Sequence, residues 1–356
     1  MRGCNSQRSP EPDRHIQAPF QNNYWSLMET SHFELTSTES ISVRFGSVPL
    51  SEELTNFRHR MGAEMMAFMR SLPESTHADA VVFFMQYFQS PFFPKCDFFK
   101  IYYSPSWSII HWLERMGSDR SPFLPIERCH ALSAHAMALF LHPLDDHLND
   151  GQLSTTHLSL LLRSQAWLRM NTALQRMAEG VAKGPEIVKG LIEDYYASIG
   201  TPPAQSTLDG YCRHFRKQMA TWMSVPVLMA MKMKVAEDFS EVLQDAYGGF
   251  GIAWRLLDDL QDLDSDMKTG SHSAIYFCLP LEIRLIWDQS PQSEDVRRFK
   301  IIRSAVYNDG VWETIKRRIG TELATAASTL DEIQMTGLAE ELRCLAWPFR
   351  DRPAMS

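Results

Sequence analysis

The chain has 356 residues, of which 44% are hydrophobic and 22% charged, a balance typical of a globular protein with a sizeable core. Its 35 Lys and Arg against 43 Asp and Glu leave a net charge of −8, so no positive field would attract nucleic acid or anionic lipid. The six cysteines form no CxxC pair, which argues against a disulfide framework and a structural zinc site and favours a reducing, cytoplasmic setting.

Residues 1–45 are polar, with Pro, Ser and Thr scattered through them, and we predict a poorly ordered N-terminal arm. Four aromatic residues in it leave open that part of the arm docks on the body or on a partner subunit: Phe20, Tyr24, Trp25 and Phe33. The first residues carry charge, Pro and Ser where a secretory signal would carry an apolar run. Since the longest apolar stretches also fall short of the roughly 18 residues of a membrane span, we expect neither export nor stable membrane insertion.

Residues 46–356 show apolar side chains at three- and four-residue spacing and few alternating runs, which predicts a single all-α domain. In chain order, the clearest predicted helices cover about 53–71, 127–149, 155–178, 206–235, 239–264 and 311–329. Several are longer than the mean helix and none carries sustained heptads. The pattern therefore favours one large bundle of long helices over a coiled coil or a repeat array.

Two acidic clusters follow apolar helices: DDHLND at 145–150 and DDLQDLDSD at 258–266. Positions i and i+4 share a helix face, so Asp146 can point with Asp150, and Asp258 with Asp262. Carboxylates packed so closely at the negative end of a helix need a cation, and magnesium accepts one or two carboxylates together with phosphate oxygens. A solvated helix end explains one such cluster equally well, but the presence of two favours a diphosphate held by metal between them.

The residues before each cluster are apolar and partly aromatic, as the wall of a shaft for a hydrocarbon tail would be. We expect five residues to line this cavity, although core packing explains any one of them alone: Phe140, Leu141, Trp222, Phe250 and Trp254.

The chain resembles the class I isoprenoid synthases, that is the trans-prenyltransferases and terpene synthases, and especially the farnesyl diphosphate synthases. In that family the second motif reads DDxxD with a further Asp four residues on, and here Asp266 follows 258–262. FGIAWRLLDD matches the family's apolar approach to that motif, and Lys217 stands nine positions before Pro226 as in the family's intervening helix. The resemblance covers about residues 125–285.

The resemblance implies the isoprenoid synthase fold, a homodimer, a prenyl diphosphate substrate and magnesium, with three ions around bound diphosphate. It implies metal ligation by Asp145, Asp146, Asp150, Asp258, Asp262 and Asp266, with Asp259 also catalytic. By the same resemblance Lys217 would bind the allylic diphosphate.

The departures from the family concern the second substrate. Chain-elongating members carry an Arg pair after the first motif, but here the first Arg is Arg163, and the upstream Gly-Lys-Arg segment and the downstream Lys are missing. Without these cations a second diphosphate would meet net negative charge, so ordinary elongation is not expected. Arg213, Arg216 and Lys217 share one helix face and Lys268 follows the second motif, and these could bind diphosphate or be plain surface cations.

Three points about the first motif stay open. His142 and His147 flank it and allow a metal phosphohydrolase, although no HExxH pattern or further His–Asp dipeptide completes such a site. Pro143 should kink the helix, and the extra residue in DDHLND leaves the metal register undecided.

The preferred function is a terpene synthase-like enzyme that ionises one allylic diphosphate with magnesium and gives a cyclised or rearranged product. Phe140 and Leu141 stand where related prenyltransferases place the floor of the shaft, and a Phe there favours a ten- or fifteen-carbon chain. One alternative is a prenyltransferase that joins the allylic diphosphate to isopentenyl diphosphate or to an unusual acceptor. Another is a non-catalytic partner subunit of a prenyl synthase, which the retention of both acidic clusters disfavours.

Overall fold

A computed structural model describes residues 43–90, 97–118, 123–149, 151–199, 201, 203–236, 238–289 and 296–350. The chain divides into residues 1–39 and 40–356, and every described residue belongs to the second unit. Of the predicted arm, residues 1–42 lie outside the described residues, so the arm stays a prediction.

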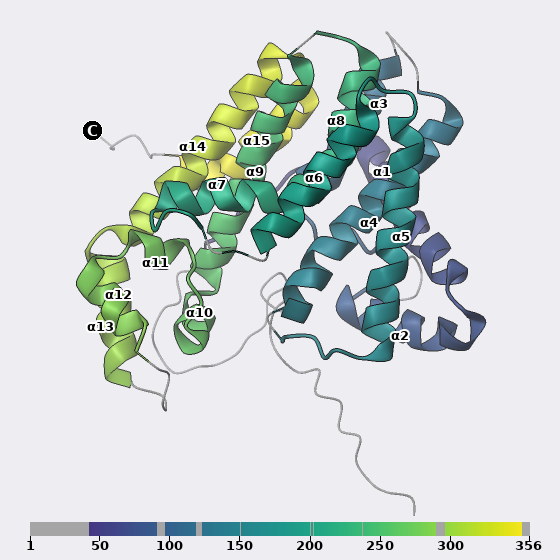
Figure 1. The fold of residues 1–356 in the computed structure, drawn as a ribbon. Coiled ribbons are helices and arrows are strands. Elements are labelled where there is room, and N and C mark those ends of the chain that lie inside the picture. Colours follow the sequence, from purple (N-terminus) through teal and green to yellow (C-terminus); the bar gives the residue numbers. More distant parts are fainter. Residues whose placement is uncertain are drawn as a thin grey trace, which may run out of the picture. The chain divides into compact units, whose positions relative to one another are not determined.

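Within the described ranges every regular element is helical, which confirms the all-α prediction (Figure 1). The α-helices are α1 Glu52–Ser71, α2 His77–Tyr87, α3 Pro105–Ser118, α4 Pro125–Asn149, α5 His157–Ala178, α6 Gly184–Ile199, α7 Leu208–Gln218, α8 Ala220–Met233, α9 Phe239–Gln261, α10 Leu263–Thr269, α11 Ala274–Cys278, α12 Leu281–Trp287, α13 Val296–Asn308, α14 Val311–Glu332 and α15 Thr336–Ala346.

Two of the predicted helices are too long. The segment predicted as one helix at 206–235 is divided into α7 and α8 at Met219, whose backbone has ψ −3°. Met219 is fully buried against Gly251 of α9, where a Cβ would lie 2.4 Å from the Met219 methyl carbon. No Gly or Pro marks this bend in the local sequence, so tertiary packing decides it. The helix predicted at 239–264 ends at Gln261, and α10 begins after Asp262.

Helix α4 is the central helix of the described unit. Every residue from Ala131 to Asp145 is buried, and the helix packs against α1, α3, α5 and α8. A helix that is covered on all faces needs apolar side chains around its whole circumference, as this segment has. The first acidic cluster therefore begins where a buried helix reaches the edge of the core.

Helix α9 carries the second acidic cluster and lies between α14 and α8. A Cβ at Gly249 would lie 3.3 Å from Ala326 of α14, and Gly251 faces Met219 just before α8. Small residues on both sides of α9 allow this close approach. The helix is thus fixed by its neighbours before it reaches the acidic residues.

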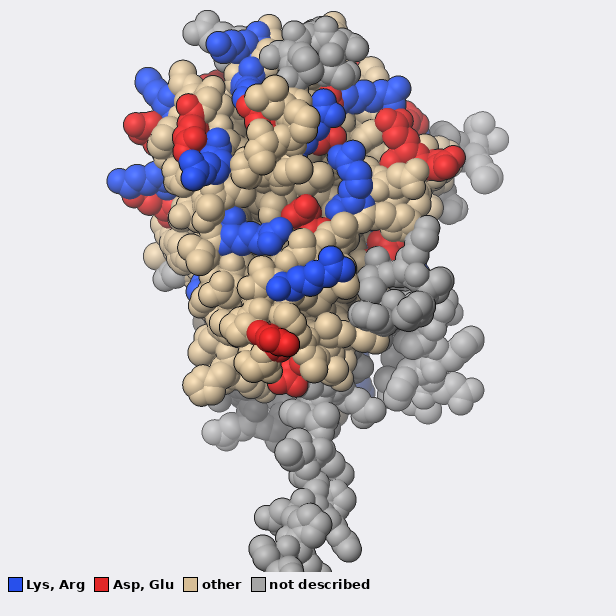
Figure 2. Space-filling view, turned by 90° about the vertical axis from the view of Figure 1, so that its right-hand side faces the viewer, with Lys and Arg blue, Asp and Glu red and all other residues tan. Residues whose placement is uncertain are grey.

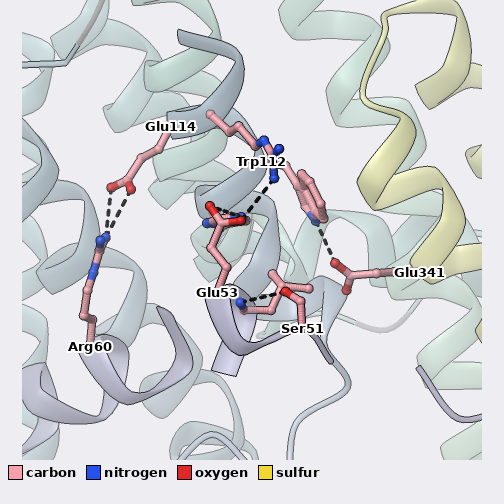
Figure 3. A network of polar contacts seen from close by, with 9 residues as sticks. Ser51, Glu53, Arg60, Trp112, Glu114 and Glu341 are labelled. Atoms are coloured by element: carbon pink, nitrogen blue, oxygen red, sulfur yellow. Dashed lines mark hydrogen bonds and ion pairs between the residues drawn. The ribbon is translucent and has the colours of Figure 1, made fainter. Parts of the chain in front are cut away.

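A polar network ties the first helices to the last one (Figure 3). Trp112 of α3 donates to Glu341 of α15 at 2.6 Å, and Ser108 donates to the other carboxylate oxygen at 2.9 Å. Burial raises the pKa of the Glu341 carboxyl, and these two donors oppose that rise. The ion pair of Arg60 with Glu114 at 3.1 Å links α1 to α3, but Arg60 is half exposed and adds little stability.

No helix among the described residues has both the length and the apolar character needed to cross a bilayer. On the face shown in Figure 2, basic and acidic side chains are interspersed among the coloured residues rather than separated by sign. Ion pairs such as Arg169 with Glu64 at 2.9 Å link α5 to α1.

Candidate active site

The two acidic helices, α4 and α9, both end toward the lower side of Figure 1. Asp145, the first acidic residue of α4, is only 3% exposed and is bound by other protein groups. Arg163 donates to both of its oxygens at 2.6 and 3.2 Å, Tyr195 donates at 3.0 Å, and the Trp167 indole at 3.4 Å. Asp145 therefore faces α5 and α6 and holds the end of α4 against them.

Asp146 lies about 100° further round the helix and has a different environment. It is half-buried, and no described residue donates a hydrogen bond to it. Its charge raises the pKa of both Asp258 and Arg255 on α9, which places it opposite the second cluster. Asp150, its predicted i+4 partner, lies outside the described residues.

Asp259 in the second cluster is, like Asp145, bonded by other protein groups. Its side chain is 1% exposed. Tyr211 donates to it at 3.2 Å, the backbone N–H of Ala274 at 2.9 Å and Arg255 at 3.0 Å. These bonds tie α9 to α7 and α11.

Asp258 and Asp262 are one helical turn apart and remain more open. The Asp258 side chain is 23% exposed, and within the described ranges its one ion pair is with Arg255, at 3.5 Å. Burial raises the pKa of Asp258 well above its ordinary value, Arg255 opposes this, and Asp262, Asp259 and Asp146 raise it further. Burial and three neighbouring carboxylates thus act against the one local cation, Arg255.

Asp266 extends this cluster into α10. Burial, together with the charges of Asp259 and Asp262, raises the pKa of Asp266 to about 8. Its Oδ2 atom is buried without a hydrogen-bond partner. An orphaned carboxylate oxygen beside other carboxylates is the environment that a hard cation would relieve.

Sequence reasoning missed the role of Arg255. Its guanidinium also bonds the Tyr211 hydroxyl at 2.8 Å and lies 5.8 Å over the Phe215 ring. The spacing that could have revealed it is that Asp258 and Asp259 follow at i+3 and i+4. Three further partners of the acidic residues were missed, together with Tyr211, because they lie far from them in sequence: Arg163, Trp167 and Tyr195.

Four rings lie together, two of them one turn before Asp146 and Asp258, and we call this group the aromatic box: His142, Phe215, Trp222 and Trp254. The His142 ring lies 5.1 Å from that of Trp222, and Trp222 lies 5.7 Å from Trp254. Burial lowers the pKa of His142 to about 4, so its imidazole is neutral at physiological pH.

The other predicted cavity residues lie elsewhere in the core. Phe140 is fully buried among the rings of Phe68, Phe84 and Phe88, which belong to α1 and to the α2 end. Phe250 packs on Tyr247 with ring centroids 5.8 Å apart. Leu141 is 1% exposed. Their role as cavity lining stays a prediction.

The predicted diphosphate-binding cations are dispersed. Lys217 lies 3.9 Å from Asp194 of α6, and Arg216 pairs at 2.7 Å with Asp245 near the beginning of α9. Arg213 donates to Gln205, and Lys268 is exposed in the last turn of α10. The three α7 cations, which the sequence predicts on one helix face, therefore bind different partners.

The flanking histidines, His142 and His147, are both buried. Nδ1 of His147 lies 3.0 Å from the Tyr87 hydroxyl. Across the part of the chain that the structure describes, no three His, Cys, Asp or Glu side chains converge closely enough to hold a metal by themselves.

Comparison of sequences finds no matching family model and no matching curated protein. Comparison of structures does find similar folds. Geranylgeranyl pyrophosphate synthase from Corynebacterium glutamicum superimposes with a TM-score of 0.62 at 14% identity, covering 87% of this chain and 96% of that one. Polyprenyl synthetase from Streptomyces coelicolor gives 0.60 at 13% identity, covering 83% and 99%.

Decaprenyl diphosphate synthase from Rhodobacter capsulatus gives a TM-score of 0.58 at 14% identity, covering 84% of this chain and 99% of that one. The Corynebacterium enzyme complexed with isoprenyl diphosphate and magnesium gives 0.54 at 15% identity, covering 86% and 100%. Likeness at such low identity establishes the fold and not the activity. The fold expected from the two acidic motifs is confirmed: the chain has the isoprenoid synthase fold of the trans-prenyltransferases.

Proposed function

We propose that this protein is a terpene synthase-like enzyme that ionises one allylic prenyl diphosphate with the help of magnesium. The observation that carries the proposal is the pairing of Asp146 with Asp258 across the ends of α4 and α9. The charge of Asp146 raises the pKa of Asp258, yet Asp146 has no hydrogen-bonding partner among the described residues.

The residues fit magnesium. Asp146 on one side, with Asp258 or Asp262 on the other, would hold it, since the ion takes one or two carboxylates and completes its shell with water and phosphate oxygens. Bound there, magnesium would neutralise charge on the leaving diphosphate as a Lewis acid. Asp145 and Asp259 are satisfied by protein donors, so we assign them to orienting the two helix ends instead.

The distribution of cations supports a single diphosphate substrate. Arg163, the first Arg after the first motif, is used in binding Asp145. Arg216 and Lys217 have acidic partners of their own. Of the predicted diphosphate-binding cations, Arg213 and Lys268 alone have no carboxylate partner within the described residues, which favours binding of one diphosphate and therefore ionisation and rearrangement over elongation.

The aromatic box would serve the hydrocarbon part of the substrate. Its rings lie one turn from the carboxylates, where a cation formed by loss of diphosphate would first appear. Aromatic faces stabilise a nearby cation, and a buried apolar wall limits access of bulk water. Arg255 would keep Asp258 and Asp259 in place during this step.

The test is incubation with ten-, fifteen- and twenty-carbon allylic diphosphates and magnesium, with and without isopentenyl diphosphate. We expect pyrophosphate release and terpene products from a ten- or fifteen-carbon substrate without isopentenyl diphosphate. Longer prenyl diphosphates formed only with isopentenyl diphosphate would instead identify a prenyltransferase.

A binding measurement distinguishes a non-catalytic partner subunit from an active enzyme whose substrate is not among those tested. Magnesium with inorganic pyrophosphate should raise the melting temperature of the wild type, since a ligand that binds only the folded state stabilises it. Asp146→Ala should lose this effect. Absence of both stabilisation and pyrophosphate release would refute the proposed function.

A further inference from the structure

Two buried nitrogen atoms in the aromatic box lack hydrogen-bond partners: Nδ1 of His142 and Nε1 of Trp222. Their rings are in contact, with centroids 5.1 Å apart. His142 is 9% exposed and Trp222 is 2% exposed. Buried polar atoms in native proteins are almost always paired with protein or with ordered water, so two orphans side by side indicate a small polar guest.

The two groups complement each other chemically. An indole N–H can only donate a hydrogen bond, whereas a neutral imidazole offers one nitrogen that accepts. Burial keeps His142 neutral by lowering its pKa to about 4; the charge of Asp146 opposes this shift, and that of Arg255 adds to it. A water molecule could accept from Trp222 and donate to His142 at the same time, while the Phe215 ring offers it no competing polar atom.

The position of this pair relative to the carboxylates matters for chemistry. His142 precedes Asp146 by four residues on α4, and Trp254 precedes Asp258 by four on α9. Residues four apart share a helix face and are separated by one turn, about 5.4 Å along the axis. The aromatic box thus lies one helical turn before the carboxylates, next to the carbon chain of a substrate whose diphosphate they would hold.

We propose that His142 and Trp222 hold a water molecule that captures the allylic cation, so that the enzyme releases a terpene alcohol. This deepens the proposed function and rests on it. The allylic C–O bond breaks with its electron pair leaving on diphosphate, and the water oxygen then forms a new C–O bond to the cation. The resulting oxonium ion is a far stronger acid than imidazolium, so its proton passes to His142. Overall, prenyl diphosphate and water give alcohol, diphosphate and a proton.

The experiment is turnover in water enriched in oxygen-18, with pyrophosphate release and products measured in the same reactions. We expect an alcohol carrying the label, because capture of a cation places solvent oxygen on carbon. Trp222→Phe keeps an aromatic ring and removes the N–H, and it should lower the ratio of alcohol to hydrocarbon about fivefold, as loss of one hydrogen bond would. His142→Leu should lower it further.

Trp287→Phe is the matched control. Its indole nitrogen is also buried without a partner, but it lies in α12 and packs on Tyr276, outside the box. It should leave the product ratio unchanged. If Trp222→Phe misfolds, the product ratio of His142→Leu against that of Trp287→Phe decides whether this pair holds the water.

Three negative outcomes of this labelling experiment can be distinguished from one another. Pyrophosphate release with only hydrocarbon products would overturn the water-capture inference and leave the proposed function intact. An alcohol without the label would also overturn it, since it would show cleavage of the P–O bond. If no allylic diphosphate releases pyrophosphate, both the proposed function and the inference built on it are wrong.

Discussion

The Tyr102 hydroxyl donates a hydrogen bond to the backbone carbonyl of Leu139 at a distance of 2.9 Å. Leu139 is the residue four positions before Pro143, which has no N–H to offer that carbonyl. Tyr102 thus replaces the hydrogen bond that proline removes from the interior of α4. This explains how the helix continues through Pro143 to Asn149 and carries Asp145 and Asp146 beyond it.

Tyr102→Phe should lower the free energy of unfolding by about 1 kcal/mol, because it leaves the Leu139 carbonyl without a donor. In a Pro143→Ala background the same change should cost less, since the alanine backbone would supply the missing N–H. Urea unfolding of the four proteins in this double-mutant cycle measures the coupling. Tyr103→Phe is the control, as the Tyr103 hydroxyl makes no hydrogen bond within the described part of the chain. If Tyr102→Phe lowered the free energy of unfolding equally in both backgrounds, the Tyr102 hydrogen bond would not replace the one that Pro143 removes.

The two adjacent aspartates of α4 should respond differently to mutation. Asp146→Ala and Asp258→Ala should each reduce turnover by about a thousandfold or more, because each removes several kcal/mol of charge stabilisation by metal, and helical content should stay unchanged. Both should also abolish stabilisation by magnesium with pyrophosphate. Near-normal activity in either variant would refute the model of two facing carboxylate sites.

Asp145→Asn provides the contrast. It weakens the bonds from Arg163, Tyr195 and Trp167, so its main effect should be a lower melting temperature. Stabilisation by magnesium with pyrophosphate should persist in this variant. Loss of that stabilisation, without a lower melting temperature, would assign Asp145 to the metal after all.

The fold class was predictable from the sequence because the period of the apolar residues is a local property, and the paired acidic clusters were visible for the same reason. What could not be predicted is which acidic residue of α4 is bound by other protein groups and which one faces the second cluster. Asp145 and Asp146 are neighbours, and only the placement of Arg163, eighteen residues on, decides that Asp145 turns toward α5.

The division of 206–235 at Met219 has a similar cause. The helix is interrupted where Met219 meets Gly251 of α9, a contact between residues far apart in the chain.

The pairing of Arg255 was predictable in principle from its spacing to Asp258 and Asp259. Its importance becomes evident only when Tyr211 of α7 is placed beside it.

Arg255→Gln should reduce stability by about 3 kcal/mol in the absence of metal, since it leaves the buried Asp259 with less compensation for its charge. Arg303→Gln is a matched control on the same cluster, because Arg303 pairs with the exposed Asp264 at 2.8 Å and such pairs contribute at most about 1 kcal/mol. Urea unfolding of both variants without magnesium tests the difference. Equal losses would mean that Arg255 is no more than a surface cation.

Glu341 should make stability depend on pH. Burial raises its pKa above the ordinary value of 4.5, so the folded protein holds this proton more tightly than the unfolded chain does. Its contribution is therefore fully present below about pH 4.5 and is lost as the pH rises through the folded pKa. Glu341→Gln should remove this fall in the free energy of unfolding, whereas Glu340→Gln, at an exposed neighbour, should keep it. Parallel pH profiles of wild type and Glu341→Gln would exclude the effect.

The last prediction concerns substrate length and Phe140. The family resemblance places it at the floor of the shaft, but its ring lies 5.0 Å from Phe84 and 6.1 Å from Phe68, on the side of α1 and α2. The aromatic box contacts α4 through His142, whose direction from the helix axis differs by about 160° from that of Phe140. We therefore expect Phe140 to act by packing.

Phe140→Ala should cost about 3–5 kcal/mol in stability, as truncation of a buried Phe usually does. Phe140→Leu is milder and suited to kinetics, and it should leave the ratio of kcat/KM for fifteen- and twenty-carbon substrates within about twofold of wild type, since volume opens away from the chain. Phe84→Leu, in the same ring cluster, is the control and should behave alike. If Phe140→Leu shifts the preference to the twenty-carbon substrate and Phe84→Leu does not, then Phe140 closes the shaft. Only a residue in contact with the end of the carbon chain can exchange its own volume for added methylenes, each of which contributes about 0.8 kcal/mol when buried.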